Sequence, residues 1–199
     1  MSLLLDDIST DYKPFDAEMN VAEAQDFFVD APFSHFPVLD QGIFVGCIAK
    51  NEVDGFDFTK KLDDYKYTFA PIFARENVIL LDILELFSKN EANLIPILNS
   101  HNQYVGYFEL ENVFQHFLKT TFLSETGTLL VVQKPINDYS MSQIAQIVES
   151  NNGRLLGMYV SFADLTHIQI TLKINVGEIN DIIQSFRRYD YELISEHQH

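Results

Sequence analysis

The chain has 199 residues, of which 47% are hydrophobic, and it carries a formal net charge of −16. Acidic residues outnumber Lys and Arg by 29 to 13, and no basic cluster exceeds two adjacent residues, so binding to nucleic acid or to an anionic membrane surface is disfavoured. No apolar run approaches the ~18 residues that span a membrane. The acidic start Met-Ser-Leu-Leu-Leu-Asp-Asp has no signal-peptide pattern, so we expect a cytoplasmic protein.

The first predicted elements along the chain are a helix and two apolar strands. The strands cover residues 36–39 and 43–48 and are joined by a tight turn, and residues 12–15 form a weaker leading strand. The single cysteine, Cys47, lies in the second strand, where we expect a small buried hydrophobic side chain. The apolar residues of the helix share one face: Val21, Ala24 and Phe28.

The same order of elements returns about sixty residues later. After an acidic connection over 53–65, a leading strand over 67–73 precedes a helix, and apolar strands follow over 94–98 and 104–108. The apolar residues of this second helix follow the i, i+3, i+4, i+7 rule: Leu80, Ile83, Leu84 and Phe87.

The two stretches match residue by residue. Pro37 and Pro96 are 59 residues apart, and the Val-Gly pairs that end in Gly46 and Gly106 are 60 apart. The one-residue change falls in the turns between the strands, where length changes are tolerated. Because one unit of this size buries too little apolar surface alone, we predict two βαββα-type repeats that pack together about an approximate twofold axis.

The sequence around each proline resembles a CBS motif. His-Phe-Pro-Val-Leu-Asp, a turn and Phe-Val-Gly-Cys-Ile-Ala form the first copy, and Leu-Ile-Pro-Ile-Leu-Asn, a turn and Tyr-Val-Gly-Tyr-Phe-Glu form the second. The resemblance is to a tandem CBS pair, or Bateman module, with repeats over 1–64 and 65–122. It implies a disk-like unit that often dimerises and has two clefts for adenosine-containing ligands of the AMP, ATP, NAD or S-adenosylmethionine type.

Residues 126–195 predict a second domain. A strand over 128–132 is followed by a helix that Ser140 caps, then by an alternating strand pair over 156–174, a helix that starts at Asn175, and a last strand over 191–194. This βαββαβ order is ferredoxin-like. After a CBS pair it resembles an ACT domain, a dimerising module that senses small ligands, and the whole chain is similar to acetoin-utilisation-type CBS–ACT proteins.

The predicted ligand clefts depart from the family pattern. CBS clefts that bind nucleotides usually end their second strand with Ser/Thr-x-x-Asp, whereas this chain has Ala49-x-x-Glu52 and Glu109-x-x-Asn112. Ala49 has no hydroxyl group. Glu109 puts a negative charge where a phosphate is expected, and like charges ~4 Å apart repel by roughly 4 kcal/mol at an effective dielectric of about 20. The first cleft is therefore the better candidate.

We predict ligand binding by residues around these two motifs. The alternative for any one of them is that it only packs the core of the repeats. The candidates are Tyr12, Pro14, His35, Phe36, Pro37, Ala49, Glu52, Pro71, Leu94, Ile95, Pro96, Glu109 and Asn112. The loop over 134–140 of the second domain has no glycine for close approach to an amino acid, so dimerisation is at least as plausible a role there.

No catalytic signature is present. The chain lacks a Gly-x-Gly-x-x-Gly turn, a P-loop, a His-Glu-x-x-His pair and a Gly-x-Ser-x-Gly elbow. The only histidines with paired spacing are His197 and His199, and we predict no metal site. Two hypotheses follow: a homodimeric, non-catalytic sensor that signals to an unknown regulated protein, or a constitutive dimeric scaffold that has lost its ligand.

Overall fold

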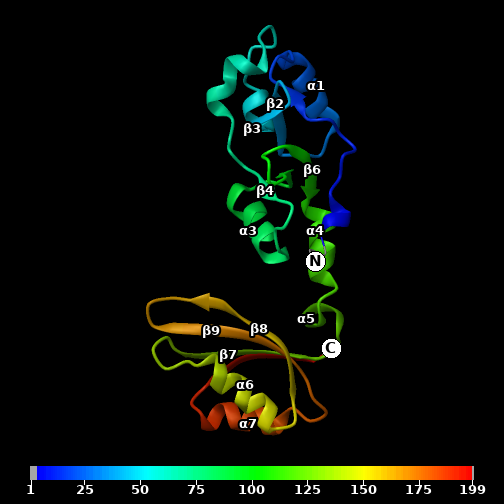
Figure 1. Ribbon diagram of the computed structural model, residues 1–199. Helices are drawn as coiled ribbons and strands as arrows, with labels where there is room; N and C mark the ends of the chain where they lie inside the picture. Colours follow the sequence, from blue (N-terminus) through cyan, green and yellow to red (C-terminus); the bar gives the residue numbers. More distant parts are fainter. Residues whose placement is uncertain (1–3, 199) are drawn as a thin grey trace. The chain divides into compact units, whose positions relative to one another are not determined.

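The computed structural model describes residues 4–198, which Figure 1 shows as a ribbon, and the side chains of residues 4–196. The chain divides into two compact units, Met1–Phe117 and Leu118–His199. The predicted repeat and domain limits 1–64, 65–122 and 126–195 remain predictions. His199, and with it the paired spacing noted at the end of the chain, lies outside the described residues. None of the helices in the described part is both long and apolar enough to cross a membrane.

The first unit begins with one three-stranded sheet and its helices. In this sheet β2 lies between β1, which is parallel to it, and β3, which is antiparallel. The elements in chain order are η1 (Leu5–Asp7), β1 (Phe15–Asp16), α1 (Val21–Asp30), β2 (His35–Asp40), β3 (Ile43–Ala49), α2 (Lys50–Val53) and η2 (Leu62–Thr68).

A second sheet in the same unit repeats this topology. β5 lies between the parallel β4 and the antiparallel β6. The elements are β4 (Ala74–Arg75), α3 (Leu80–Asn90), β5 (Leu94–Leu98), β6 (Tyr104–Glu109) and α4 (Leu110–Leu118). Pro37 faces Cys47 across the first hairpin, and Pro96 faces Tyr107 across the second, so the two prolines occupy equivalent positions. The predicted repeat is confirmed.

The predicted leading strand over 67–73 is wrong. This segment begins inside η2 and then continues without regular pairing to Ala74, where β4 starts. Ala70 forms an isolated antiparallel bridge with Cys47 of β3 instead, because the segment runs across to the other repeat. The predicted strand over 12–15 overlaps β1 only at Phe15.

The two matched glycines have a steric role at this crossing. Gly46 has φ +143° and Gly106 has φ +149°, a backbone conformation that residues other than glycine rarely adopt. A Cβ on Gly106 would lie 2.5 Å from Ile8 Cγ2, and one on Gly46 would lie 2.8 Å from Phe69 Cβ. The Val-Gly pairs therefore mark where a segment from outside the hairpin lies directly against each hairpin.

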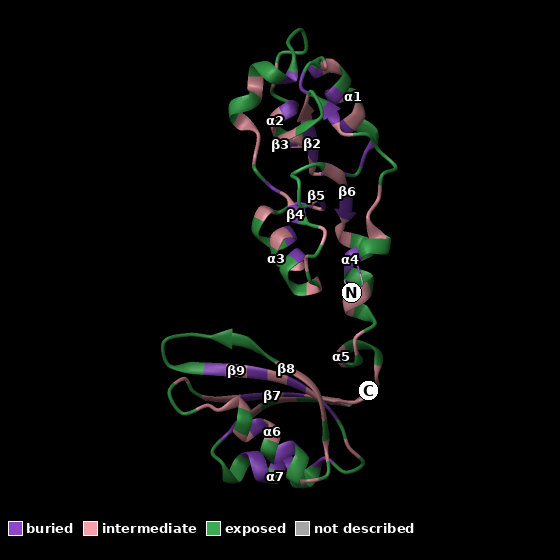
Figure 2. Ribbon diagram, viewed as in Figure 1, coloured by how far each residue is buried: buried purple, intermediate pink, exposed green. Residues whose placement is uncertain are grey.

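The second unit is a four-stranded antiparallel sheet with the order β10-β7-β9-β8. The predicted βαββαβ order is confirmed. Figure 2 shows buried residues along β9 and on α6 and α7, and these residues form one core with β7. The elements are α5 (Thr121–Ser124), β7 (Thr128–Pro135), α6 (Met141–Ser150), β8 (Arg154–Ala163), β9 (His167–Asn175), α7 (Asn180–Arg188) and β10 (Glu192–Gln198).

Capping signals in this unit succeed once and fail once. The Ser140 hydroxyl accepts a hydrogen bond from the Gln143 amide at the start of α6, as predicted. The predicted helix start at Asn175 is wrong, because Asn175 is the last residue of β9 and pairs with Arg154 of β8. The sheet pairing outweighs the local capping pattern, and α7 begins at Asn180.

Candidate functional site

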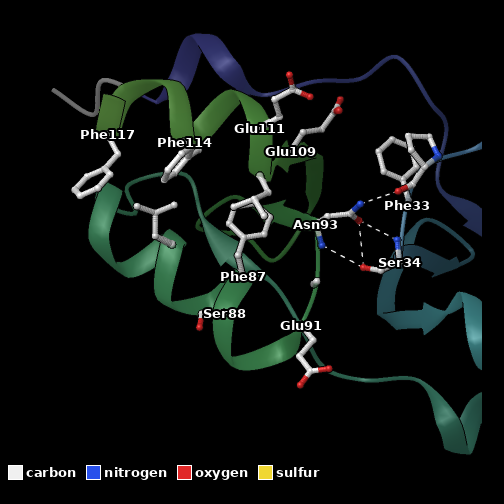
Figure 3. Close-up of a pocket in the computed structure, with 14 residues that line it drawn as sticks. Phe33, Ser34, Phe87, Ser88, Glu91, Asn93, Glu109, Glu111, Phe114 and Phe117 are labelled. Carbon is white, nitrogen blue, oxygen red and sulfur yellow. Dashed lines mark hydrogen bonds between the residues drawn. The ribbon is translucent and has the colours of Figure 1, made fainter. Parts of the chain in front are cut away.

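Equivalent residues of the two repeats meet directly in the first unit. The Ser34 amide donates to Asn93 Oδ1 at 2.8 Å, and the Asn93 amide donates to Ser34 Oγ at 3.1 Å (Figure 3). Asn93 Nδ2 also donates to the Pro32 carbonyl at 2.7 Å. Ser34 and Asn93 each stand directly before the central strand of their repeat. These reciprocal contacts are those that an approximate twofold axis requires.

The segment that leads into each repeat crosses to a strand of the other repeat. The amides and carbonyls of Cys47 and Ala70 exchange two hydrogen bonds of 2.8 Å, and those of Ser9 and Tyr107 exchange bonds of 2.9 and 3.0 Å. The side chains follow the crossing, because Tyr107 belongs to the core that contains Phe28 and Phe36, whereas Cys47 packs with Ile95 and Phe108. Each crossing therefore brings residues of both repeats together.

The cleft at the first crossing is an open cavity of about 650 Å³. It brings together three of the predicted ligand residues, His35, Ala49 and Glu52, and adds Lys89 and Asn90 from the end of α3. The cavity is thus lined by both repeats. The remaining lining residues are Ser34, Cys47, Lys50, Asn51, Asp54, Thr68, Ala70 and Glu91.

His35 and Glu52 set the electrostatics of this cavity. Burial lowers the pKa of His35, and the carboxylate of Glu52 opposes part of that shift. Because the imidazole is neutral at pH 7, it forms hydrogen bonds without adding charge, and its Nδ1 lies 3.0 Å from Ser34 Oγ. No hydrogen bond or ion pair engages the Glu52 carboxylate among the described residues, so it is available to accept hydrogen bonds from a ligand.

The two lysines that line the cavity already have partners. Lys50 Nζ donates to the Phe28 carbonyl near the end of α1, and Lys89 pairs with Glu85 on α3. Glu52, Asp54 and Glu91 meanwhile place three carboxyl groups around the same space. The site therefore offers hydrogen-bonding groups but little net positive charge to hold several phosphates.

Cys47 is buried as predicted. Its Sγ donates a weak hydrogen bond to the Ile72 carbonyl at 3.4 Å, and burial raises the pKa of the thiol far above its usual range. Burial therefore disfavours the thiolate, and the feature of Cys47 that matters for the cleft is the small size of its side chain. In the second repeat the equivalent residue is Tyr107, which is fully buried.

The second crossing is filled by aromatic side chains. The ring centroid of Tyr107 lies 5.9 Å from that of Phe33 and 6.3 Å from that of Phe36. Tyr12 closes the cluster, with its ring 5.4 Å from Phe33. Beside the cluster, burial raises the pKa of Glu109, and the nearby carboxylates of Asp11 and Glu111 add to that shift. Buried aromatic rings therefore occupy the second crossing, and the carboxylates beside it give a local excess of negative charge.

Comparison with known proteins identifies the fold of this arrangement. No family model and no curated protein matches the chain. A CBS domain pair/ACT domain protein from Thermotoga maritima matches at 16% identity over 60% of this chain and 98% of its own length, with a TM-score of 0.53. The CBS domains of a transcriptional regulator from Streptococcus pneumoniae match at 13% identity over 56% of this chain and 96% of theirs, with a TM-score of 0.50.

A third solved structure, CBSX2 in complex with AMP, matches at 17% identity over 60% of this chain and 98% of its own length, with a TM-score of 0.50. The first unit has the fold of a CBS domain pair. At these identities the likeness concerns the fold alone. What the CBS pair of this chain binds must be argued from its own clefts.

The other predicted ligand residues of the CBS pair lie away from the open cavity. Tyr12 and Pro71 are exposed, Pro14 is half-buried, and all three lie on lead-in segments. Asn112 is exposed on α4, and Glu109 lines a different cavity, between α3 and α4. The remaining predicted residues are buried in the cores: Phe36, Pro37, Leu94, Ile95 and Pro96. As ligand contacts, all of these residues remain predictions.

Motif matching missed several residues that line the open cavity. Thr68 lies at the end of η2, and Lys89 and Asn90 lie at the end of α3, so none of them falls inside a CBS motif. Thr68 reaches the site because the lead-in segment of the second repeat pairs with Cys47 of the first repeat. Lys89 and Asn90 reach it because the end of α3 lies beside the first repeat. The repeat symmetry is the one signal that pointed toward them, since it predicts that each cleft takes residues from both copies.

Proposed function

We propose that this chain is a non-catalytic, cytoplasmic regulatory protein that binds an adenosine-type ligand in the first cleft of its CBS pair and signals to a partner protein. The observation that carries the proposal is the contrast between the two crossings. One is an open cavity of about 650 Å³ lined by both repeats, and the other is filled by Tyr107. The open volume lies within the roughly 300–1,000 Å³ typical of small-molecule sites.

The lining residues favour a ligand with no more than one phosphate. Glu52 supplies a half-buried carboxylate that suits the hydroxyls of a ribose, and Asn51 supplies an amide group for a base. Three carboxyl groups against two engaged lysines disfavour a polyphosphate. AMP is therefore the first ligand to test, and the AMP complex of CBSX2, which has the same fold, supports that choice.

Regulation would follow from the position of the cleft. Because residues from both repeats line it, a ligand there favours the arrangement of the two repeats that it fits best. The size of the response is set by the difference in affinity between the two arrangements. A partner protein that recognises one arrangement would then respond to the ligand.

We propose an ACT-like, dimerising role for the second unit, as in acetoin-utilisation-type proteins. Its βαββαβ topology supports this role. So does the edge strand β8, which exposes Tyr159, Val160 and Phe162. An edge strand with exposed apolar residues is suited to pairing with a second copy.

The alternative function is a constitutive dimeric scaffold with no ligand. Ala49 favours it, because this position lacks the hydroxyl that the nucleotide-binding pattern carries. Glu109 at the equivalent place in the second repeat favours it as well. Under this alternative the open cavity is a remnant of the fold.

A thermal unfolding experiment separates the two functions. The full chain is melted with AMP, ADP, ATP, NAD, S-adenosylmethionine and amino acids. A ligand at ~100 times its dissociation constant adds about 2.7 kcal/mol to the free energy of unfolding, and we expect the largest increase with AMP. Glu52→Ala should remove the increase, whereas Asn112→Ala, at the equivalent position of the second repeat, should keep it. No increase with any compound would support the scaffold.

A further inference from the structure

A second, larger cavity opens between α3 and α4 of the CBS pair. Its volume is about 940 Å³, and Figure 3 shows the rings of Phe87 and Phe114 directed into the space between the two helices. Leu84 and Phe117 extend the apolar lining. Phe114 is 41% exposed, which is high for a phenylalanine on a folded domain. We name this feature the α3–α4 groove.

The first repeat closes the equivalent space with its own chain. Gln25 Nε2 of α1 donates to the carbonyls of Val53 and Phe56 at 2.9 and 3.2 Å, which ties α1 to the end of α2. The connection that follows covers the same core with the fully buried Leu62 and with Phe56, whose ring stacks on Tyr65 at 3.8 Å.

The second repeat has no such closure. The residue equivalent to Gln25 is Leu84, which has no polar group to reach α4. α4 is held from another direction, where His116 Nε2 lies 2.5 Å from Asp7 Oδ2 of η1. After α4 the chain enters the second unit, so α4 is not followed within the first unit by a connection like the one that follows α2. In the first repeat the space equivalent to the groove is covered by Phe56 and Tyr65, which belong to the connection after α2.

Carboxyl groups border the apolar floor of the groove. Glu109, the last residue of β6, lies beside Glu111 in the first turn of α4, and Glu91 directly follows α3 (Figure 3). None of the three takes part in an ion pair among the described residues. Burial and the neighbouring carboxylates of Asp11 and Glu111 raise the pKa of Glu109.

The charge of the groove decides between possible occupants. A second copy of this chain would bring another net charge of −16 and, in a symmetric contact, a second set of these glutamates. A basic segment instead supplies the missing cations. Apolar grooves between helices are a common docking place for amphipathic helices, whose residues at i, i+3, i+4 and i+7 enter the groove.

We infer that the α3–α4 groove binds a basic amphipathic helix of a partner protein. Apolar side chains of that helix would pack on Leu84, Phe87 and Phe114, and its Lys or Arg residues would pair with Glu109 and Glu111. The inference does not require a ligand in the first cleft, because the residues that it assigns to the partner, Leu84, Phe87, Phe114, Glu109 and Glu111, do not line that cleft. It identifies the chemistry of the partner that the proposed function leaves open.

The test uses the full chain and two labelled amphipathic helical peptides. The lysine peptide is built from leucine and lysine, and the glutamate peptide from leucine and glutamate. Binding of each peptide is measured by fluorescence anisotropy at physiological salt. We expect the lysine peptide to bind and the glutamate peptide to show at least roughly tenfold weaker binding. Leu84→Asp and the pair Glu109→Gln with Glu111→Gln should each weaken the lysine peptide by roughly tenfold or more. The glutamine variants keep the apolar floor, so they remain informative if Leu84→Asp impairs folding.

A matched control separates the groove from general attraction to an acidic protein. The pair Glu149→Gln with Glu178→Gln removes the same charge from exposed positions of the second unit and should leave the affinity unchanged. Equal weakening by both pairs would overturn the inference. Unchanged binding of the lysine peptide to Leu84→Asp would also overturn it. If the wild type binds neither peptide and light scattering shows that Leu84→Asp loses dimers, the groove belongs to a second copy instead.

Discussion

The two CBS repeats share one topology and differ in which of their spaces is filled. In the first repeat the small Cys47 leaves the crossing open, while Gln25 and the connection after α2 close the helical side. In the second repeat Tyr107 fills the crossing, while the helical side stays open as the α3–α4 groove. The two repeats thus share their strand arrangement, but the open cavity lies at the crossing in the first repeat and between the helices in the second.

The two open spaces are adjacent. Ser34 and Glu91 line both the first cleft and the α3–α4 groove. A ligand in the first cleft and a partner in the groove would therefore lie next to the same two residues. The comparison between the repeats predicts that a ligand and a partner occupy different places on one module.

The largest expected effect comes from emptying the filled crossing. Tyr107→Ala removes a fully buried ring from the aromatic cluster, and large-to-small changes of aromatic residues in a core cost about 3–5 kcal/mol. Urea unfolding of the variant and the wild type measures the loss. Tyr12→Ala, which truncates an exposed member of the same cluster, should cost much less. Similar losses for both would contradict the filled crossing.

The next effect tests the close approach of the lead-in segments. Gly106→Ala places a Cβ 2.6 Å from the Ser9 carbonyl oxygen at a positive φ, and we expect a loss of about 2–4 kcal/mol in the free energy of unfolding. Gly55→Ala serves as the control, because its nearest atom, the Glu52 carbonyl oxygen, lies at 3.5 Å. A Gly106→Ala variant as stable as the control would show that Ile8 and Ser9 do not lie against β6.

These glycines show how far the sequence alone predicts the molecule. Matched prolines and Val-Gly pairs were enough to predict the repeat and its strands, because buried strands need apolar residues at a fixed spacing. The crossing of the lead-in segments was not predicted, since irregular backbone held by two hydrogen bonds leaves no periodic pattern. Asn175 shows the same limit, because a local capping pattern carries no information about pairing with Arg154.

The site was predictable in part for a related reason. His35, Ala49 and Glu52 lie in one hairpin and the turn after it, so the motif places them together. Lys89 and Asn90 come from the other repeat, and only the spatial arrangement brings them to the cavity. The sequence predicted a poor second cleft from the charge of Glu109, whereas the structure adds the ring of Tyr107 as a steric reason.

A smaller effect is expected at the axis between the repeats. Ser34 and Asn93 exchange hydrogen bonds, so the variants Ser34→Ala and Asn93→Ala should not be additive. A double-mutant cycle by urea unfolding should give a coupling energy of about 1 kcal/mol. Additive losses would contradict direct pairing of the equivalent residues. The control cycle combines Ser34→Ala with Ser142→Ala. Ser142 is exposed on α6 of the second unit, so we expect no coupling energy between these two variants.

The smallest effect is the pH dependence that His35 adds to the open cleft. Its pKa is lowered from 6.5 in the folded chain, so the unfolded chain binds the proton more tightly. The stability from the neutral imidazole is therefore present above pH 6.5 and is lost as the pH falls through the folded pKa. Urea unfolding between pH 5 and 7 should show a shallower loss for His35→Gln than for the wild type. Equal slopes for the wild type and His35→Gln would show that the cleft does not bury the imidazole.

The most direct measurement of the account is the stoichiometry of AMP binding to the full chain by isothermal titration calorimetry. The open first cleft and the filled second crossing predict one AMP per chain. Glu52→Ala should abolish the heat of binding, and Asn112→Ala should leave it intact. Two equivalent sites per chain would contradict the assignment of the ligand to the first cleft. So would the reverse pattern, in which Asn112→Ala abolishes binding and Glu52→Ala keeps it.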